Sequence, residues 1–307
     1  MTINLSKINV YGYEFTNICN FRVNDNMYES SRYIINFLNK YKIENTNIII
    51  KNIIKSKCNL LSSYICPDIK LEDLNLVNKY IVWLFIYDDN IDINVLDEEK
   101  ITYANNIINQ IEKITLNKYN YNCKDNIETP LVLKLYIDIL KEIEIRDKEG
   151  YYYKKFIKNI LIYLETCKKE IIITHNKKIL NIYKYINLRR NNGGIPSLLI
   201  LIKLFNNIKI DKSYFTMEEI KLLEKMENIS NDHTSWFNDI ISLKKEKDEI
   251  FVFNLVKIYK NNNNVEEKVA IEKVYNMIEE ITEEFFNIKK YISNKDILKY
   301  YNDLCQF

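Results

Sequence analysis

The sequence predicts an all-α protein, built as a single large helical bundle with a central cavity. The chain has 307 residues but only 4 glycines and 3 prolines, and folds with many tight turns need those residues at the turns. Most windows also show the 3.6-residue apolar periodicity of amphipathic helices. Long helices with few breaks between them favour a bundle large enough to enclose a pocket.

The expected helices follow an aromatic, irregular N-terminal segment that covers residues 1–25. They span residues 28–41, 70–90, 97–117, 129–147, 151–171, 178–191, 195–207, 217–246, 249–260, 265–291 and 294–305. Breaks fall at Pro67, the asparagine-rich segment around Asn120, Gly150, the Gly193-Gly194 pair, Asp211 and the asparagine run 261–264. At many of these turns asparagine replaces glycine, because asparagine tolerates the left-handed backbone conformation.

Composition and charge narrow the class of protein further. Lysine and arginine number 44 against 42 acidic residues, a net charge of +2 with both signs interspersed, which gives no basis for a nucleic-acid footprint or a polybasic membrane contact. We find no Pro/Gly/Ser-rich linker and no repeat, so we expect one domain over residues 1–307. The six cysteines are scattered without a CxxC pair and are interpreted as reduced thiols.

The N-terminus lacks the layout of a signal peptide, and no run of about 18 apolar residues occurs. We therefore expect a cytoplasmic protein without a membrane span.

Three carboxylates follow the apolar, aromatic run that begins at Trp83. Asp88 and Asp92 are one helical turn apart, with Asp89 beside them, and Phe85 shares the face of Asp88. Stacked like charges destabilise a helix unless something neutralises them, and Mg²⁺ binds through carboxylates together with substrate phosphates. The alternative is a helix end that frays into an exposed acidic loop.

A second polar stripe lies near residue 238, in two registers at the spacing i, i+4, i+8. One register is Asn231, Ser235 and Asp239, and the other is Asn238, Ser242 and Glu246. An amide, a hydroxyl and a carboxylate on successive turns present oxygen ligands that suit one Mg²⁺. The alternative is a solvated helix face. We assign no role to His175 or His233, because neither has a partner at ligand spacing.

Arginine is scarce, and two of the five arginines lie side by side in Arg189-Arg190-Asn-Asn192-Gly193-Gly-Ile-Pro196. Together the three motifs resemble a class I terpene synthase of the microbial type. That family carries an aspartate-rich WxFxxDDxxD motif, an NDxxSxxKE motif followed by NLV, and an RRxxxGxxP-like sequence between them. The NLV at Asn254 favours the Asn238 register. The resemblance runs from about Cys66 to about Phe286.

The resemblance implies three Mg²⁺ ions and a diphosphate site. Asp88 would be the principal ligand of two ions, supported by Asp89 and Asp92, and the third ion would be bound by Asn238, Ser242 and Glu246. Arg189 is expected to sense the diphosphate, with Asn192 as the linking residue and Gly193 as the effector whose carbonyl lies at a helix break. Lys245 would contact the diphosphate, and Phe85 is the aromatic candidate for stabilising a carbocation.

The family's closing Arg-Tyr pair on a further C-terminal helix is not matched. The nearest pair is Lys299-Tyr300, which comes earlier and offers a point charge in place of a guanidinium fork. We retain Lys299 and Tyr300 as diphosphate-binding candidates.

The implied function is Mg²⁺-dependent ionisation of a linear prenyl diphosphate, with farnesyl diphosphate as the default substrate, to give a cyclic or acyclic terpene. A trans-prenyltransferase is the enzyme alternative, although it would show a second DDxxD motif, which the sequence lacks. A catalytically silent helical homologue acting as a binding protein is the other alternative. Dimers are common among such bundles, so a homodimer remains an open expectation.

Overall fold

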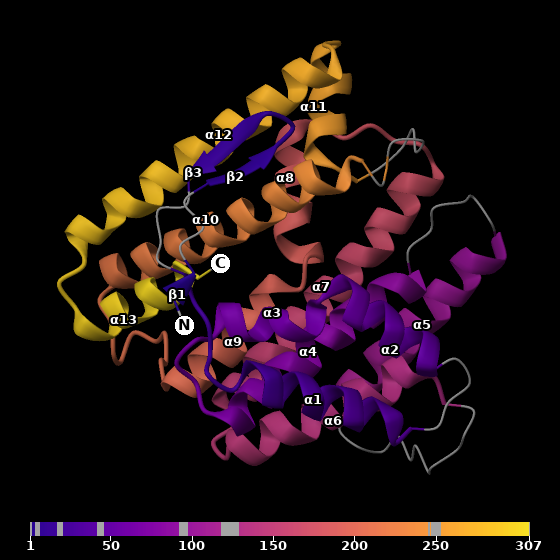
Figure 1. The fold of residues 1–307 in the computed structure, drawn as a ribbon, viewed down its shortest axis with the longest axis vertical. Helices are drawn as coiled ribbons and strands as arrows, with labels where there is room; N and C mark the ends of the chain where they lie inside the picture. The colour runs from indigo at the N-terminus through magenta and orange to yellow at the C-terminus, as the bar shows by residue number, and fades with distance from the viewer. Residues whose placement is uncertain are drawn as a thin grey trace. The chain divides into compact units, whose positions relative to one another are not determined.

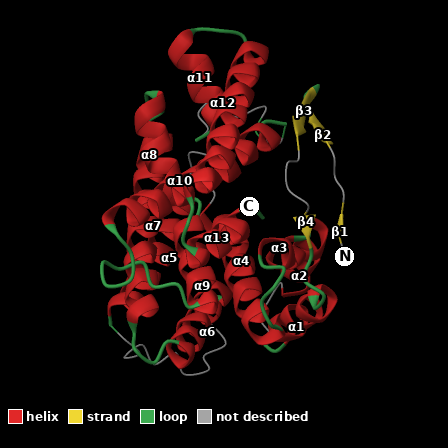
Figure 2. Ribbon diagram, turned by 90° about the vertical axis from the view of Figure 1, so that its left-hand side faces the viewer, coloured by secondary structure: helices red, strands yellow, loops and turns green. Residues whose placement is uncertain are grey.

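The computed structural model describes residues 2–3, 7–16, 21–41, 46–91, 98–117, 129–244, 246 and 253–306. Most of this part of the chain is helical, with a few short strands near the N-terminus (Figures 1 and 2). The predicted all-α class is therefore confirmed. In the described part of the chain, no helix is long and apolar enough to span a membrane.

The chain divides into two compact units. The first comprises Arg22–Leu164 and Ile200–Phe205, and the second comprises Thr2–Phe21, Glu165–Leu199 and Asn206–Phe307. Helix α7 (Tyr151–His175) and helix α9 (Ile195–Asn206) contribute residues to both units. That the whole chain acts as one domain stays a prediction.

The first unit is built around the long helix α4 (Leu71–Ile91). Its other helices are α1 (Met27–Asn39), α2 (Thr46–Ser56), α3 (Cys58–Ile65), α5 (Glu98–Leu116) and α6 (Leu131–Arg146). Helix α4 packs against α1, α3, α5 and α6. Because it is covered on several sides, α4 is apolar around much of its circumference.

An aromatic cluster anchors the second half of α4. Trp83 is fully buried, and its indole Nε1 donates to the carbonyl oxygen of Val132 at 3.0 Å. Tyr80, Tyr87 and Tyr136 stack on the indole, with ring centroids 5.8, 5.3 and 5.2 Å away. These contacts fix the part of α4 that leads to Asp88, since large aromatic side chains contribute much of the packing energy of a core.

The second unit is built around helix α10 (Met217–Ser242). It contains the last part of α7, then α8 (Ile182–Asn192), α11 (Leu255–Asn263), α12 (Glu267–Ile288), a short 3-10 helix (Lys289–Tyr291) and α13 (Lys295–Leu304). Helix α10 packs against α8, α11, α12 and α13, and α10 and α12 run side by side in Figure 1. Their shared core includes Trp236, Ile240 and Val274.

The described residues of the N-terminal segment form four short strands, whereas an irregular stretch was expected. Strand β2 (Lys7–Val10) pairs antiparallel with β3 (Tyr13–Thr16), and β1 (Thr2–Ile3) pairs with β4 (Phe21–Arg22). Tyr11 and Gly12 both have positive φ, 54° and 86°, as a two-residue type I′ hairpin turn requires. Tyr13 then packs against Tyr275 of α12 in a tilted arrangement, with ring centroids 4.9 Å apart.

Most of the expected helices are confirmed to within a few residues. Helices α2 and α3 were not expected, α10 ends at Ser242 instead of residue 246, and α11 begins at Leu255 instead of residue 249. The later start of α11 has a clear cause: the side chain of Asn254 caps it by accepting from the amide of Val256 at 2.9 Å.

Candidate active site

The end of α4 presents two of the three predicted carboxylates. The helix continues to Ile91, so Asp88 and Asp89 lie in its last turns, and both are exposed. Phe85, one turn earlier on the face of Asp88, is 42% exposed although it is a large apolar side chain. Asp92 lies outside the described residues. The roles of these residues in metal binding and cation stabilisation stay predictions.

The predicted break between α8 and α9 is present. Helix α8 ends at Asn192, Gly193 caps it with a φ of −83°, and α9 begins at Ile195. Gly194 is the residue in the left-handed region, with a φ of +70°. A Cβ added to Gly193 would meet its nearest neighbour, the Ser235 hydroxyl oxygen, at an ordinary 3.7 Å. The preference for glycine therefore falls on Gly194, because of the two glycines only Gly194 has a backbone conformation that disfavours a side chain.

The structure brings two predicted site residues, Asn192 and Asn238, to Arg189. Its guanidinium Nη1 donates to the Asn192 side-chain oxygen at 3.2 Å, and Nη2 donates to the Asn238 side-chain oxygen at 3.1 Å. Nη2 also lies 3.0 Å from the Asp239 carboxylate. The Arg189 side chain is 16% exposed and Asn238 is exposed. The positively charged guanidinium of Arg189 is thus held at the helix break, next to Asn238 of the polar stripe.

Asn192 is fixed from two sides. Its side-chain oxygen accepts from Arg189, and its amide nitrogen donates to the Glu170 carboxylate of α7 at 2.7 Å. The two bonds place the side chain between α7 and the guanidinium. Sequence reasoning did not identify Glu170, which lies 22 residues away and carries no local signal.

Asp239 is a buried carboxylate with several donors. Its Oδ2 accepts from the Tyr185 hydroxyl at 2.5 Å and from the Leu255 amide at 3.0 Å, while Oδ1 faces Arg189. Burial raises the pKa of Asp239 above its ordinary value, although the charge of Arg189 and the two hydrogen bonds oppose this. Burial and the Asp239 charge raise the pKa of Tyr185 well above its ordinary value, so its phenol remains a donor.

The side chain of Asn254 contacts the last two residues of the stripe, Ser242 and Glu246. Its amide nitrogen lies 3.2 Å from the Ser242 hydroxyl oxygen, 3.0 Å from a Glu246 carboxylate oxygen and 2.6 Å from the Asp239 carbonyl oxygen. The ammonium group of Lys257 donates to the Glu246 carbonyl oxygen. Glu246 lies beyond the end of α10, so these bonds from the start of α11 position it.

The alternative register serves a different purpose. The buried Asn231 amide donates to the carbonyl oxygen of Arg190 at 2.7 Å, and its side-chain oxygen accepts from the Ser235 hydroxyl at 3.2 Å. Arg190 itself forms a two-bond pair with Asp232, at 2.8 and 2.6 Å. These contacts satisfy a carbonyl at the end of α8 that has no partner within its own helix. The geometry therefore favours the exposed Asn238 over Asn231 as a ligand.

The Lys299-Tyr300 pair is not brought to Arg189. Lys299 is exposed on α13, whereas Tyr300 is fully buried and its hydroxyl donates to Glu227 at 2.9 Å. Glu227 precedes Asn238 by eleven positions, about 16 Å along α10 at the helical rise per residue. Tyr300 therefore helps to pack α13 onto α10. Lys245 lies outside the described residues.

The donor set of the stripe fits a hard divalent cation. Asn238, Ser242 and Glu246 offer an amide oxygen, a hydroxyl oxygen and a carboxylate, and Asn254 adjoins the last two. In the described ranges, no three histidine, cysteine or acidic side chains converge as a metal site of that kind would require. The stripe carries one negative charge, which leaves room for the anionic oxygens of a substrate in the coordination of Mg²⁺.

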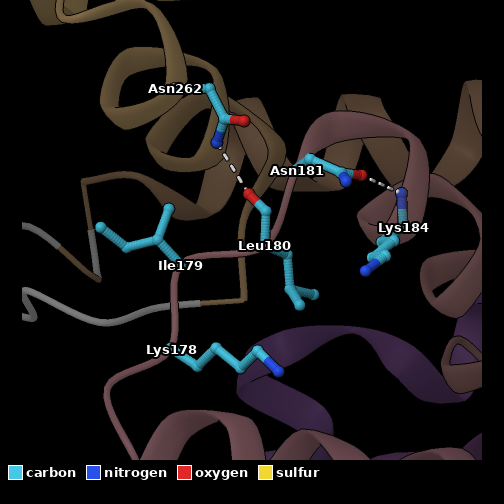
Figure 3. A pocket seen from close by; sticks show the side chains of 6 residues that line it. All are labelled: Lys178, Ile179, Leu180, Asn181, Lys184 and Asn262. Carbon is cyan, nitrogen blue, oxygen red and sulfur yellow. Dashed lines mark hydrogen bonds between the residues drawn. The ribbon is translucent and has the colours of Figure 1, made fainter.

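A surface pocket of about 370 Å³ lies at the other end of α8 (Figure 3). It is lined by Lys178, Ile179, Leu180, Asn181, Lys184 and Asn262. Asn181 caps the start of α8 by accepting from the Lys184 amide at 2.8 Å. This end of the helix is eight residues from Arg189, about 12 Å along the helix axis, so the pocket is separate from the candidate site.

Solved structures share this fold along nearly the whole chain. A hedycaryol synthase in complex with nerolidol has a TM-score of 0.75 at 15% identity, covering 97% of each chain. A linalool/nerolidol synthase from Streptomyces clavuligerus has a TM-score of 0.76 at 13% identity, covering 96% of this chain and 97% of that one. At these identities the likeness establishes the fold, which is that of the class I terpene synthases.

Sequence comparison identifies the family. The family model described as terpene synthase family 2, C-terminal metal binding, matches residues 79–284, about two thirds of the chain. The chain belongs to this family. The germacrene A synthase of Nostoc punctiforme is 24% identical over 214 residues, which cover 70% of this chain and 63% of that protein. The chain thus spans somewhat less than two thirds of the length of this curated relative.

Proposed function

We propose that the protein is a class I terpene synthase that ionises a linear prenyl diphosphate and releases a terpene. One observation carries the proposal: the Arg189 guanidinium is held at a helix break by Asn192 and Asn238, at the head of the oxygen-rich stripe on α10. Membership of a metal-binding terpene synthase family supports it. Farnesyl diphosphate is the proposed substrate, because relatives include a germacrene A synthase and a protein named sesquiterpene synthase.

The residues around the helix break would bind and orient the leaving group. Arg189 presents a planar set of N–H donors, which suits two oxygens of a diphosphate at once. Asn192 holds this plane from one side through its link to Glu170, so that little reorientation is needed when the anion binds. We propose that Lys245 adds a second positive charge.

Mg²⁺ bound by Asn238, Ser242 and Glu246 would supply Lewis-acid stabilisation of the departing diphosphate. Asp88, Asp89 and Asp92 are proposed as ligands of two further Mg²⁺ ions. The chain's own contribution to this step is to hold the oxygens in place. The backbone of α10 fixes Asn238 and Ser242, while Asn254 and Lys257 fix Glu246.

After ionisation, the carbocation must be protected from water and stabilised by neighbouring groups. Phe85 offers an uncovered aromatic face one turn before Asp88, and such faces attract cations by about 1–2 kcal/mol when desolvated. No nucleophilic side chain is required, because the reaction ends with loss of a proton or capture of water.

The test is incubation of the purified protein with geranyl, farnesyl or geranylgeranyl diphosphate and Mg²⁺, followed by analysis of volatile products. We expect a terpene from farnesyl diphosphate. Asn238→Ala and Asp88→Ala should abolish its formation while leaving helicity unchanged, and Asn187→Ala, an exposed asparagine on α8, is the matched control. No terpene from any substrate would refute the proposal. A longer diphosphate formed only with isopentenyl diphosphate would identify a prenyltransferase instead.

A further inference from the structure

We propose that Asp239, held in place by Tyr185, is a positioning residue that sets the orientation of Arg189 for binding a diphosphate. The inference rests on the proposed function, and it assigns roles to two residues that the motif pattern leaves without any. Asp239 lies beside the expected ligand Asn238, yet its side chain is only 3% exposed.

The two oxygens of Asp239 have separate partners. Oδ1 lies 3.0 Å from Nη2 of Arg189. Oδ2 accepts from the Tyr185 hydroxyl at 2.5 Å and from the Leu255 backbone amide at 3.0 Å. The carboxylate therefore cannot turn toward solvent without losing three interactions, and its plane is fixed.

Tyr185 and Arg189 reach the carboxylate from the same helix. They are four residues apart on α8 and so share one face of it. Tyr185 is fully buried, and its ring packs on Phe253 with centroids 4.7 Å apart. The phenol is thus a rigid donor, whereas Arg189 is a long side chain whose rotamer freedom the carboxylate restricts together with Asn192 and Asn238.

This arrangement distinguishes a positioning role from simple stabilisation. A guanidinium paired with a fixed carboxylate on one side is held in a defined plane, so less rotational freedom is lost when an anion binds. If Tyr185 is deprived of its hydroxyl, Oδ2 loses one of its two hydrogen bonds and the carboxylate is held less firmly. The consequence should be weaker binding of the anion that Arg189 contacts, without a general loss of structure.

The experiment measures the affinity of inorganic diphosphate in the presence of Mg²⁺ by calorimetry, alongside the KM and kcat for farnesyl diphosphate. Tyr185→Phe should weaken diphosphate binding about tenfold, the scale of one hydrogen bond to a charged group, and should raise KM while helicity stays unchanged. Tyr183→Phe is the matched control, because Tyr183 is on the same helix and is 76% exposed. It should bind as the wild type does.

A double-mutant cycle tests whether the effect passes through Arg189. In an Arg189→Ala background, Tyr185→Phe should cause no further loss of diphosphate affinity. An equal loss in both backgrounds, or wild-type affinity in Tyr185→Phe, would overturn the inference. If Asp239→Asn folds, it should reproduce the loss; if it does not fold, the Tyr185 cycle decides alone.

The outcomes also separate this inference from the proposed function. Diphosphate binding without terpene formation by the wild type would refute the function, and the calorimetric cycle would still decide the role of Tyr185 and Asp239. Terpene formation with unaltered binding in Tyr185→Phe would refute the positioning role alone. Absence of diphosphate binding by the wild-type protein would overturn both.

Discussion

Asn254 offers the sharpest test of how the candidate site is held together. It is fully buried, and its side chain both caps a helix and donates hydrogen bonds. Its oxygen caps α11 by accepting from the Val256 amide, while its nitrogen bonds the Asp239 carbonyl, the Ser242 hydroxyl and the Glu246 carboxylate. Asn254→Ala removes both functions, whereas Asn254→Asp keeps the capping oxygen and removes only the donor.

The expected loss can be worked out bond by bond. Loss of an N-cap costs about 1 kcal/mol. The bond to the buried Asp239 carbonyl contributes about 1 kcal/mol and the bond to the Glu246 carboxylate about 1.5 kcal/mol. We therefore expect Asn254→Ala to lower the free energy of unfolding by about 3–4 kcal/mol. Asn254→Asp should lose more than half of this, because it also places a carboxylate beside Glu246.

The assay is urea unfolding followed by far-UV circular dichroism. Asn181→Ala is the matched control, since Asn181 caps α8 through a single exposed bond to the Lys184 amide, and it should cost no more than about 1 kcal/mol. Equal losses in Asn181→Ala and Asn254→Ala would refute the reasoning, because the buried donor bonds would then contribute nothing.

Further predictions concern single positions. Gly194→Ala should destabilise the protein by about 1 kcal/mol because its φ is +70°, while Gly193→Ala should leave the unfolding midpoint unchanged; the reverse order would contradict the assigned geometry of the break. Burial lowers the pKa of His233 to about 4 from 6.5. Its contribution to stability is therefore complete above pH 6.5 and falls by about 2 kcal/mol on acidification to pH 5. In melting temperatures measured across this pH range, His233→Gln should reduce the decrease between pH 6.5 and pH 5. Lys79→Met should cost about 2–4 kcal/mol in urea unfolding, because it leaves two carboxylates without the buried ammonium that they share, and a neutral result would show that this ion cluster does not stabilise the first unit.

The sequence predicted most helices because their apolar periodicity is long and their breaks are marked by glycine, proline or asparagine. It missed α2, where isoleucines crowd together in Ile48–Ile50 and blur the apolar face, and α3, which has only eight residues. It missed the hairpin because the turn is Tyr11-Gly12 and lacks the Asn-Gly pair that usually marks such turns.

The candidate site was predictable only where a motif fixes the spacing. The motif residues Arg189, Asn192 and Asn238 come together in the structure, whereas their roles stay predictions. The contacts of Asp239 and Tyr185 were not predictable, because they join residues 54 positions apart and leave no pattern along the chain. The spacing alone left two registers seven residues apart, the NLV at Asn254 favoured the Asn238 register, and only the structure showed that Asn231 bonds the end of α8.

The Leu255 backbone amide gives the site a built-in reporter. This amide donates to the same Asp239 carboxylate that pairs with Arg189. The rate at which this amide exchanges its proton with solvent therefore depends on how firmly the carboxylate is held. If a diphosphate binds at Arg189 as proposed, hydrogen–deuterium exchange at the first turn of α11 should slow when the anion is added.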